Sequence, residues 1–360
     1  MLLYPVYALL FADAGLSTGA ISSLFAIWSI VSFLAEVPSG ALADRWSQRG
    51  LFAVGSAVTA SGYALWIIWP AYPGFALGFV LWGVGGACAS GTLEALVYDH
   101  LGSPDYARVM GRAGTAGILA MLAATLLAAP VYAVGGYRLV GIASVATVTL
   151  SGLLALRLPS APFRTPEEVT ESSEDSYAAT LRDGLRASVR NARTIWAVLI
   201  AALVPGFTAL DEYLPLLSRE KGAATTVVPL LFALTALAMA GGSALAGRFP
   251  TLARRRLAAL LALAAALVAA GALTRSLPGM VAVSAAFGLL QFAMVLTETR
   301  LQEAITGRAR TTVLSISGFL SEVFAVALYG LFALDAPLPA LFALCGLPLA
   351  ATAFATARYI

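Results

Sequence analysis

One acidic residue in the middle of an apolar run is the clearest candidate for chemistry in this sequence. Glu322 lies about eleven residues into the run 311–332, between Leu320 and Val323, and no basic residue stands within a helical turn of it. Desolvation disfavours the charged form of a carboxyl group in apolar surroundings, which suits a group that takes up and releases a proton. Glu322 is therefore a candidate for proton coupling. The alternative is a neutral, hydrogen-bonded structural acid.

Two further acids, Asp211 and Glu212, stand in the apolar run 195–217. They follow Pro205–Gly206, a pair expected to kink a helix, and this places them in its outer third. They are also candidates for proton coupling, as residues of a gate. They could equally line the wet outer mouth of the molecule.

Other charged residues stand near the ends of apolar runs. Glu36, Glu94 and Glu298 lie within a turn or two of such ends, and Arg112 lies about one turn into the next run. An ionisable residue at membrane depth is costly and marks function by default. We expect Glu36, Glu94 and Arg112 to form a buried ion cluster in the first half of the chain. Such a cluster either latches helices together or carries protons.

The elements that must position these residues are apolar helices. Of 360 residues, 60% are hydrophobic and 11% charged, against about 45–50% and about 25% in soluble domains. The excess apolar surface must face lipid, and one crossing needs roughly 20 apolar residues. We predict an all-α membrane protein with about twelve transmembrane helices, at residues 1–14, 18–41, 51–69, 74–98, 107–133, 137–156, 195–217, 225–246, 257–273, 279–304, 311–332 and 337–356.

A polar stretch divides the chain into two predicted halves, 1–158 and 194–360, joined by a cytoplasmic linker, 159–193. The linker begins with an acidic segment, 167–175, which indicates disorder. Apolar residues then recur every fourth position over 181–189, which predicts a short amphipathic helix on the inner membrane surface. The linker is either a plain tether or a regulatory docking site.

Basic residues predict the orientation in the membrane. With the loop 42–50 inside, nearly all arginines fall on the cytoplasmic side, as expected for cytoplasmic loops. Both termini are then cytoplasmic, and we predict a multi-pass protein of a bacterial cytoplasmic membrane. Four basic residues fall outside: Arg138, Arg219, Lys221 and Arg275.

The two halves repeat each other with an offset near 205 residues. Leu9–Leu10, Asp13-x-Gly15 and Thr18 match Leu216–Leu217, Glu220-x-Gly222 and Thr225. Parallel six-helix repeats imply a pseudo-two-fold axis along the membrane normal, with a site near the midplane between them. By the same offset, helix 1 is truncated, and we expect the natural start about fourteen residues before Met1.

The loop after the second run carries a family signature. Gly40–Ala–Leu–Ala–Asp44–Arg45–Trp–Ser47–Gln48–Arg49 resembles the signature loop of the major facilitator superfamily, and 36–40 and 91–99 resemble a bacterial, drug-exporter-like branch. Ser47 and Gln48 depart from the pattern, and Gly247 stands where the second half would carry the counterpart of Asp44. The resemblance implies a two-times-six-helix carrier in which Asp44 sits near a positive helix N-terminus. A charge latch would then involve Gly40, Asp44, Arg45, Arg49, Asp99, Glu36, Glu94, Arg112 and Glu298.

The resemblance also implies that the first, fourth, seventh and tenth helices line a cavity. Their mid-depth side chains are mostly aromatic or soft, which suits an amphipathic organic molecule better than a sugar or an ion. Each could instead be a packing residue. The candidates are Tyr4, Tyr7, Trp82, Phe207, Gln291, Phe292 and Met294.

These observations predict a secondary transporter that exports a small amphipathic organic molecule by proton-coupled alternating access. The alternatives are a proton-coupled uptake symporter and a non-transporting membrane module for lipid handling or sensing. An enzyme is disfavoured, because the single histidine, His100, has no arguable nucleophile partner. We expect no cofactor or metal and no nucleic-acid partner. The expected partners are the small molecule, protons and membrane lipid, and the expected state is a monomer.

Overall fold

A computed structural model describes residues 1–43, 46–90, 92–158, 192–249, 251–304, 310–334 and 336–359. Every regular element in these ranges is a helix, which confirms the predicted all-α class. The chain divides into two compact units, Met1–Val169 with Thr225–Leu230, and Thr170–Ala224 with Leu231–Ile360. The predicted linker, 159–193, lies almost wholly outside the described residues.

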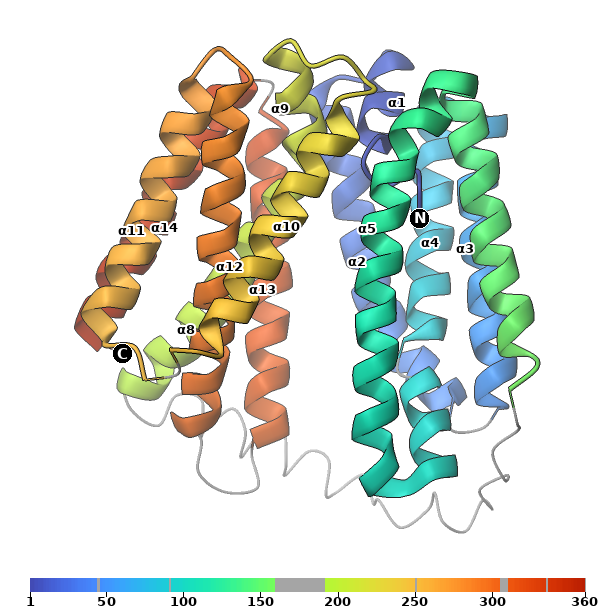
Figure 1. The fold of residues 1–360 in the computed structure, drawn as a ribbon, viewed down its shortest axis with the longest axis horizontal. Coiled ribbons are helices and arrows are strands. Elements are labelled where there is room, and N and C mark those ends of the chain that lie inside the picture. Colours follow the sequence, from blue (N-terminus) through green and yellow to red (C-terminus); the bar gives the residue numbers. More distant parts are fainter. Residues whose placement is uncertain are drawn as a thin grey trace. The chain divides into compact units, whose positions relative to one another are not determined.

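The described part of unit 1 contains the helices α1 (Tyr7–Asp13), α2 (Thr18–Ala43), α3 (Gln48–Ile68), α4 (Tyr72–Ala89) and α5 (Thr92–Ala155) (Figure 1). The long α5 turns back on itself in Figure 1 and contains Gly136, whose φ of +58° is readily adopted only by glycine. Its two arms therefore hold the two predicted helices 107–133 and 137–156.

The predicted helix 74–98 is wrong as one continuous element. The α4 helix ends at Ala89, and Ser90 has extended dihedrals with its amide hydrogen-bonded to the carbonyl of Gly86. The Thr92 hydroxyl donates to the carbonyl of Ala89 at 2.8 Å. Serine and threonine offer the backbone such alternatives to helical bonds, and they interrupt the run here.

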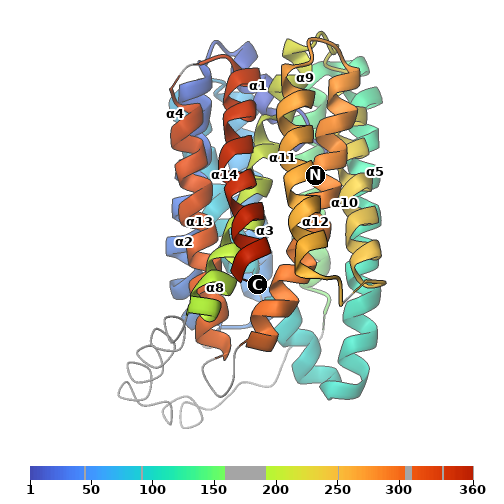
Figure 2. The ribbon, with the colours of Figure 1, turned by 90° about the vertical axis from the view of Figure 1, so that its left-hand side faces the viewer.

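Unit 2 contains α8 (Ala192–Gly206), the 3-10 helix η1 (Phe207–Tyr213), α9 (Leu214–Glu220), α10 (Val228–Ala246), α11 (Arg254–Leu273), α12 (Pro278–Ala304), α13 (Arg310–Phe332) and α14 (Leu338–Tyr359). Within this unit α11 and α14 lie side by side (Figure 2). The η1 segment follows Pro205–Gly206, so the helix changes from α to 3-10 geometry at this pair. The kink expected there stays a prediction.

The number of membrane crossings is close to the prediction. Ten stretches of the described chain are long and apolar enough to cross a membrane, and one of them, Arg108–Ala155, has 48 residues. At 1.5 Å per residue, the helical length of this stretch along the chain is about 72 Å, which is enough for two crossings of a core about 30 Å thick. The described part of the chain is thus a multi-pass membrane protein. Large apolar side chains such as Ile68 and Phe354 lie exposed on it, as lipid contact requires.

The internal repeat reappears in the backbone at the ends of α1 and α9. Leu16 donates its amide to Phe11 and Gly15 to Ala12, which is the hydrogen-bond pattern of a Schellman cap. At an offset of 207 residues the same two bonds recur, from Ala223 to Ser218 and from Gly222 to Arg219. Gly15 and Gly222 have φ values of +90° and +88°. Helices α1 and α9 therefore end in the same way.

The two caps differ in how they are tied to the rest of their unit. In unit 1 the Asp13 carboxylate accepts a hydrogen bond from the Tyr137 hydroxyl. In unit 2 the Lys221 ammonium donates hydrogen bonds to the carbonyls of Ala272 and Thr274. These bonds give partners to carbonyl groups at the C-terminal end of α11, where the helix itself provides none. Burial lowers the pKa of Lys221, and the neighbouring Glu220 carboxylate opposes this shift.

We predict that Gly222→Ala lowers the apparent Tm of the detergent-purified protein. A left-handed backbone costs an alanine about 1–2 kcal/mol, and a methyl group at this position meets no atom within 4 Å, so conformation alone is tested. Gly86→Ala in α4, where a methyl group also meets nothing within 4 Å, is the control and should leave Tm unchanged or raised. Equal Tm shifts in the two variants would contradict the cap assignment.

Candidate functional site

The break between α8 and η1 positions the first two acids. Pro205 lacks an amide hydrogen and cannot continue the helical hydrogen-bond ladder. Its carbonyl accepts a hydrogen bond from the Thr208 hydroxyl at 2.6 Å. The chain then runs as a 3-10 helix through Asp211 and Glu212 before α9 begins.

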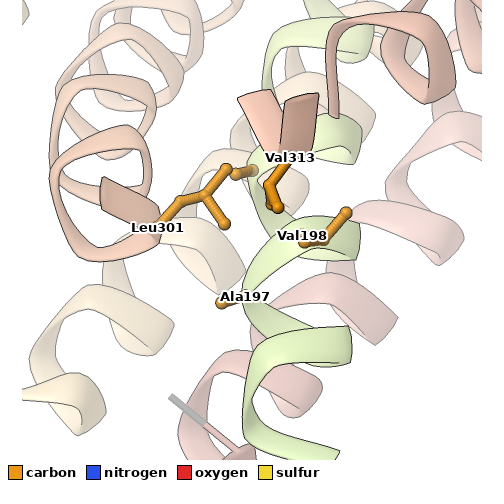
Figure 3. Packing of buried hydrophobic residues seen from close by; sticks show 5 residues of the cluster. Ala197, Val198, Leu301 and Val313 are labelled. Atoms are coloured by element: carbon orange, nitrogen blue, oxygen red, sulfur yellow. The ribbon is translucent and has the colours of Figure 1, made fainter. Parts of the chain in front are cut away.

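Helix α13 carries the third acid and packs against this broken helix. Figure 3 shows an apolar cluster that joins α8, α12 and α13, made of Ala197, Val198, Ala201, Leu301 and Val313. Farther along, the absence of a side chain at Gly206 makes room for the ring of Phe324. Phe207 meets the same ring edge-on, with 4.8 Å between centroids.

The three predicted proton-coupling residues lie on two elements that pack together, η1 and α13. Tyr329 of α13 is 3% exposed and lies near Tyr213 at the end of η1. Glu212 is itself buried, Asp211 is half-buried and Glu322 is exposed. The structure thus brings together acids from two separate runs, but whether they carry protons stays a prediction.

Tyr329 was missed by the sequence reasoning, although a signal existed. It follows Glu322 by seven residues, which is two helical turns, so both lie on one face of α13. Its ring lies 6.3 Å from that of Tyr213 at the end of η1. Tyr213 in turn stacks on Phe332 with 4.0 Å between centroids. These aromatic contacts hold the acidic segment of η1 against α13.

The predicted charge latch lies largely outside the described side chains. Arg49 donates a hydrogen bond to the carbonyl of Leu158 at 2.8 Å, at the end of α5. Ser47, which departs from the family signature, is the N-cap of α3 and accepts from the amide of Gly50. Asp44 and Arg45 fall outside the described residues, as do the surroundings of Gly40 and the side chains of Glu94 and Asp99.

Three described members of the latch are exposed, whereas Arg49 is half-buried. Glu36 on α2, Arg112 on α5 and Glu298 on α12 all have exposed side chains. The side chains of Glu36 and Arg112 are both described, and they form no ion pair with each other. The proposed cluster with Glu94 stays a prediction.

The cavity candidates fall into two groups. Tyr4, Tyr7 and Trp82 join an aromatic nest within unit 1, which we define as Tyr4, Tyr7, Phe11, Phe25, Trp28, Tyr63, Trp66, Phe75, Phe79 and Trp82. In unit 2, Phe207 and Phe292 are buried, whereas Gln291 and Met294 of α12 are half-buried.

We predict that Gly206→Ala destabilises the protein by about 1–3 kcal/mol, as overpacked cores generally do. The added methyl group would stand 2.5 Å from the Phe324 ring. In a Phe324→Leu background the same substitution should lower the apparent Tm much less, because the obstructing ring edge is gone. Equal Tm losses in both backgrounds would show that this contact does not pair α8 with α13.

Long apolar helices in two units, with acidic residues inside the apolar runs, define a polytopic membrane protein of the transporter class. The sequence model of the Major Facilitator Superfamily matches residues 1–328. The chain therefore belongs to the major facilitator superfamily, and it is a transporter of that family.

Solved structures agree with this assignment. The chain is similar to a bacterial homologue of the human lysosomal transporter Spinster in an inward-facing, unoccupied conformation, with 16% identity, a TM-score of 0.68, and 99% of this chain and 90% of that chain covered. It is similar to the nucleoside transporter NupG, with 12% identity, a TM-score of 0.73, and coverages of 98% and 93%. At such identities the likeness shows the fold alone. No curated protein matches the sequence.

Proposed function

We propose that this protein exports a small amphipathic organic molecule in exchange for protons, across a bacterial cytoplasmic membrane, by alternating access of its two halves. The cytoplasmic bias of the arginines supports an orientation with both termini inside. In this proposal the carrier works as a monomer, with protons and its substrate as partners. It belongs to the drug-exporter-like branch that 36–40 and 91–99 resemble.

One observation carries the proposal: η1, which carries Asp211 and Glu212, packs against α13, which carries Glu322, within the membrane-spanning part of unit 2. Neighbouring carboxylates repel one another when ionised, so such a group binds protons more readily than an isolated carboxylate. A group that gains a proton on one side and loses it on the other can couple the proton gradient to the conformational cycle. Ionisable residues inside transporter helices commonly form such relays.

The substrate class follows from the cavity candidates. Aromatic and thioether side chains offer an adaptable, largely apolar wall with few polar anchors. Such a wall favours a small molecule with one apolar face and one polar group. The inward-facing relatives of similar fold support alternating access as the mode of movement.

The proposal is tested in proteoliposomes. Compounds that raise the apparent Tm of the purified protein are first selected, because a ligand stabilises the state it binds. Each is then tested for flux under an imposed pH gradient, with a pH-sensitive dye reporting proton movement. We expect substrate movement opposite to proton movement. Movement of both in the same direction would identify an uptake symporter, and absence of any flux would favour a non-transporting membrane module.

We predict that Glu322→Gln leaves the apparent Tm nearly unchanged, because the amide keeps the shape of the carboxyl group. Flux should continue down a substrate gradient but lose its dependence on the pH gradient, since this position no longer titrates. Glu303→Gln, at an exposed carboxyl group of α12, is the matched control and should keep the wild-type pH dependence. An unchanged pH dependence in Glu322→Gln would contradict its role in coupling.

A further inference from the structure

A buried hydroxyl group in unit 1 has no partner. Tyr7 is 1% exposed, and its hydroxyl oxygen is buried without a hydrogen-bond partner among the described residues. In the same aromatic nest the indole N–H of Trp66 donates to the carbonyl of Phe75 at 3.1 Å. Polar groups in protein interiors are almost always paired, because an unpaired one loses its hydration without compensation. A phenylalanine would fill the place of Tyr7 without that cost.

Aromatic rings surround Tyr7 in unit 1. Six rings have centroids between 5.5 and 6.2 Å from that of Tyr7: Tyr4, Phe11, Phe25, Trp66, Phe79 and Trp82. Four of these rings are buried, whereas Tyr4 and Trp82 are half-buried. Tyr4 and Trp82 are therefore the rings of this set that reach the surface of the unit.

The two half-buried rings differ in their contacts. Tyr4 meets Tyr7 and Trp82 edge-on at 5.6 and 6.5 Å, whereas Trp82 also lies against Trp28, Tyr63, Trp66 and Phe79. Edge-on aromatic pairs are worth little individually, so a flat ring of similar size can take the place of Tyr4. Displacement of Tyr4 would bring such a ligand against the ring of Tyr7.

We propose that the aromatic nest of unit 1 binds an uncharged, planar aromatic ligand, and that the Tyr7 hydroxyl donates a hydrogen bond to an acceptor atom of that ligand. The inference rests on the proposed function and narrows its substrate class. Every member of the nest is aromatic, so the nest offers stacking surface and the unpaired Tyr7 hydroxyl rather than a counter-charge. A site that must pair a buried polar group discriminates against ligands that leave it unpaired.

Quinoline and naphthalene form a matched pair of probes for this site. They share shape and size, but only quinoline carries a ring nitrogen that accepts a hydrogen bond, and it is uncharged at pH 7. Trp28, Trp66 and Trp82 lie in the nest, so binding can be followed by quenching of tryptophan fluorescence in the detergent-purified, full-length protein, corrected with a free tryptophan amide. We expect quinoline to bind about tenfold more tightly than naphthalene.

The variant Tyr7→Phe separates a binding role from a structural one. It should abolish the preference for quinoline while leaving the apparent Tm equal to, or above, that of the wild type, because no unpaired hydroxyl remains. Tyr132→Phe is the control: Tyr132 lies outside the nest, on α5 of the same unit, with its ring centroid 4.9 Å from that of Tyr137, and loss of its hydroxyl should keep the preference. Tyr7→Phe with a lowered Tm and an unchanged preference would show that the hydroxyl serves packing only.

Failure of this inference is distinguishable from failure of the proposed function. Equal affinities for quinoline and naphthalene in the wild type would overturn the ligand assignment, whatever proteoliposome flux shows. A wild-type preference that persists in Glu322→Gln supports a ligand site in unit 1 that does not depend on the acids of unit 2. Absence of proton-coupled flux alongside a Tyr7-dependent preference would overturn the coupling and leave the ligand site standing.

Discussion

The structure depends on one constraint: lipid offers no hydrogen-bond partners, so every backbone amide and carbonyl within the membrane must be satisfied by the protein itself. This is why the described chain is built of helices, and why each interruption is accompanied by a substitute bond or by close packing. At the end of α4 the Ser90 amide donates to the Gly86 carbonyl, and the Thr92 hydroxyl donates to the Ala89 carbonyl. At Gly206 the chain keeps helical hydrogen bonding by tightening into a 3-10 segment, packed against α13.

The two units share a backbone feature but use their interiors differently. Helices α1 and α9 end with the same glycine cap, 207 residues apart. Unit 1 has aromatic rings around Tyr7, whereas unit 2 packs the acidic segment η1 against α13. On the proposals made above, a duplicated scaffold has diverged into one half that recognises the ligand and another that responds to protons.

Much of this arrangement can be predicted from sequence, because apolar runs and the signature 40–49 directly reflect the membrane and the family. An irregularity at Pro205–Gly206 was predictable for a different reason: proline removes a specific helical hydrogen bond. The break at Ser90 could not be predicted, because serine and threonine are tolerated inside many helices. Only the local hydrogen bonds determine whether the helix ends there. The position of Tyr329 beside η1 could not be predicted either, because contacts between distant runs depend on how the helices pack. The predicted latch residues Asp44 and Arg45 lie outside the described residues.

The burial of Lys221 has a consequence for the whole surface. It is the only lysine among the 22 lysine and arginine residues of the sequence, and its side chain is 7% exposed. Apart from the terminal amine, the positive charge that the protein displays is therefore carried by guanidinium groups, which keep their proton at any pH a protein tolerates. Alkaline media leave this cationic profile unchanged, and reagents that acylate amines find almost nothing on the folded molecule to modify.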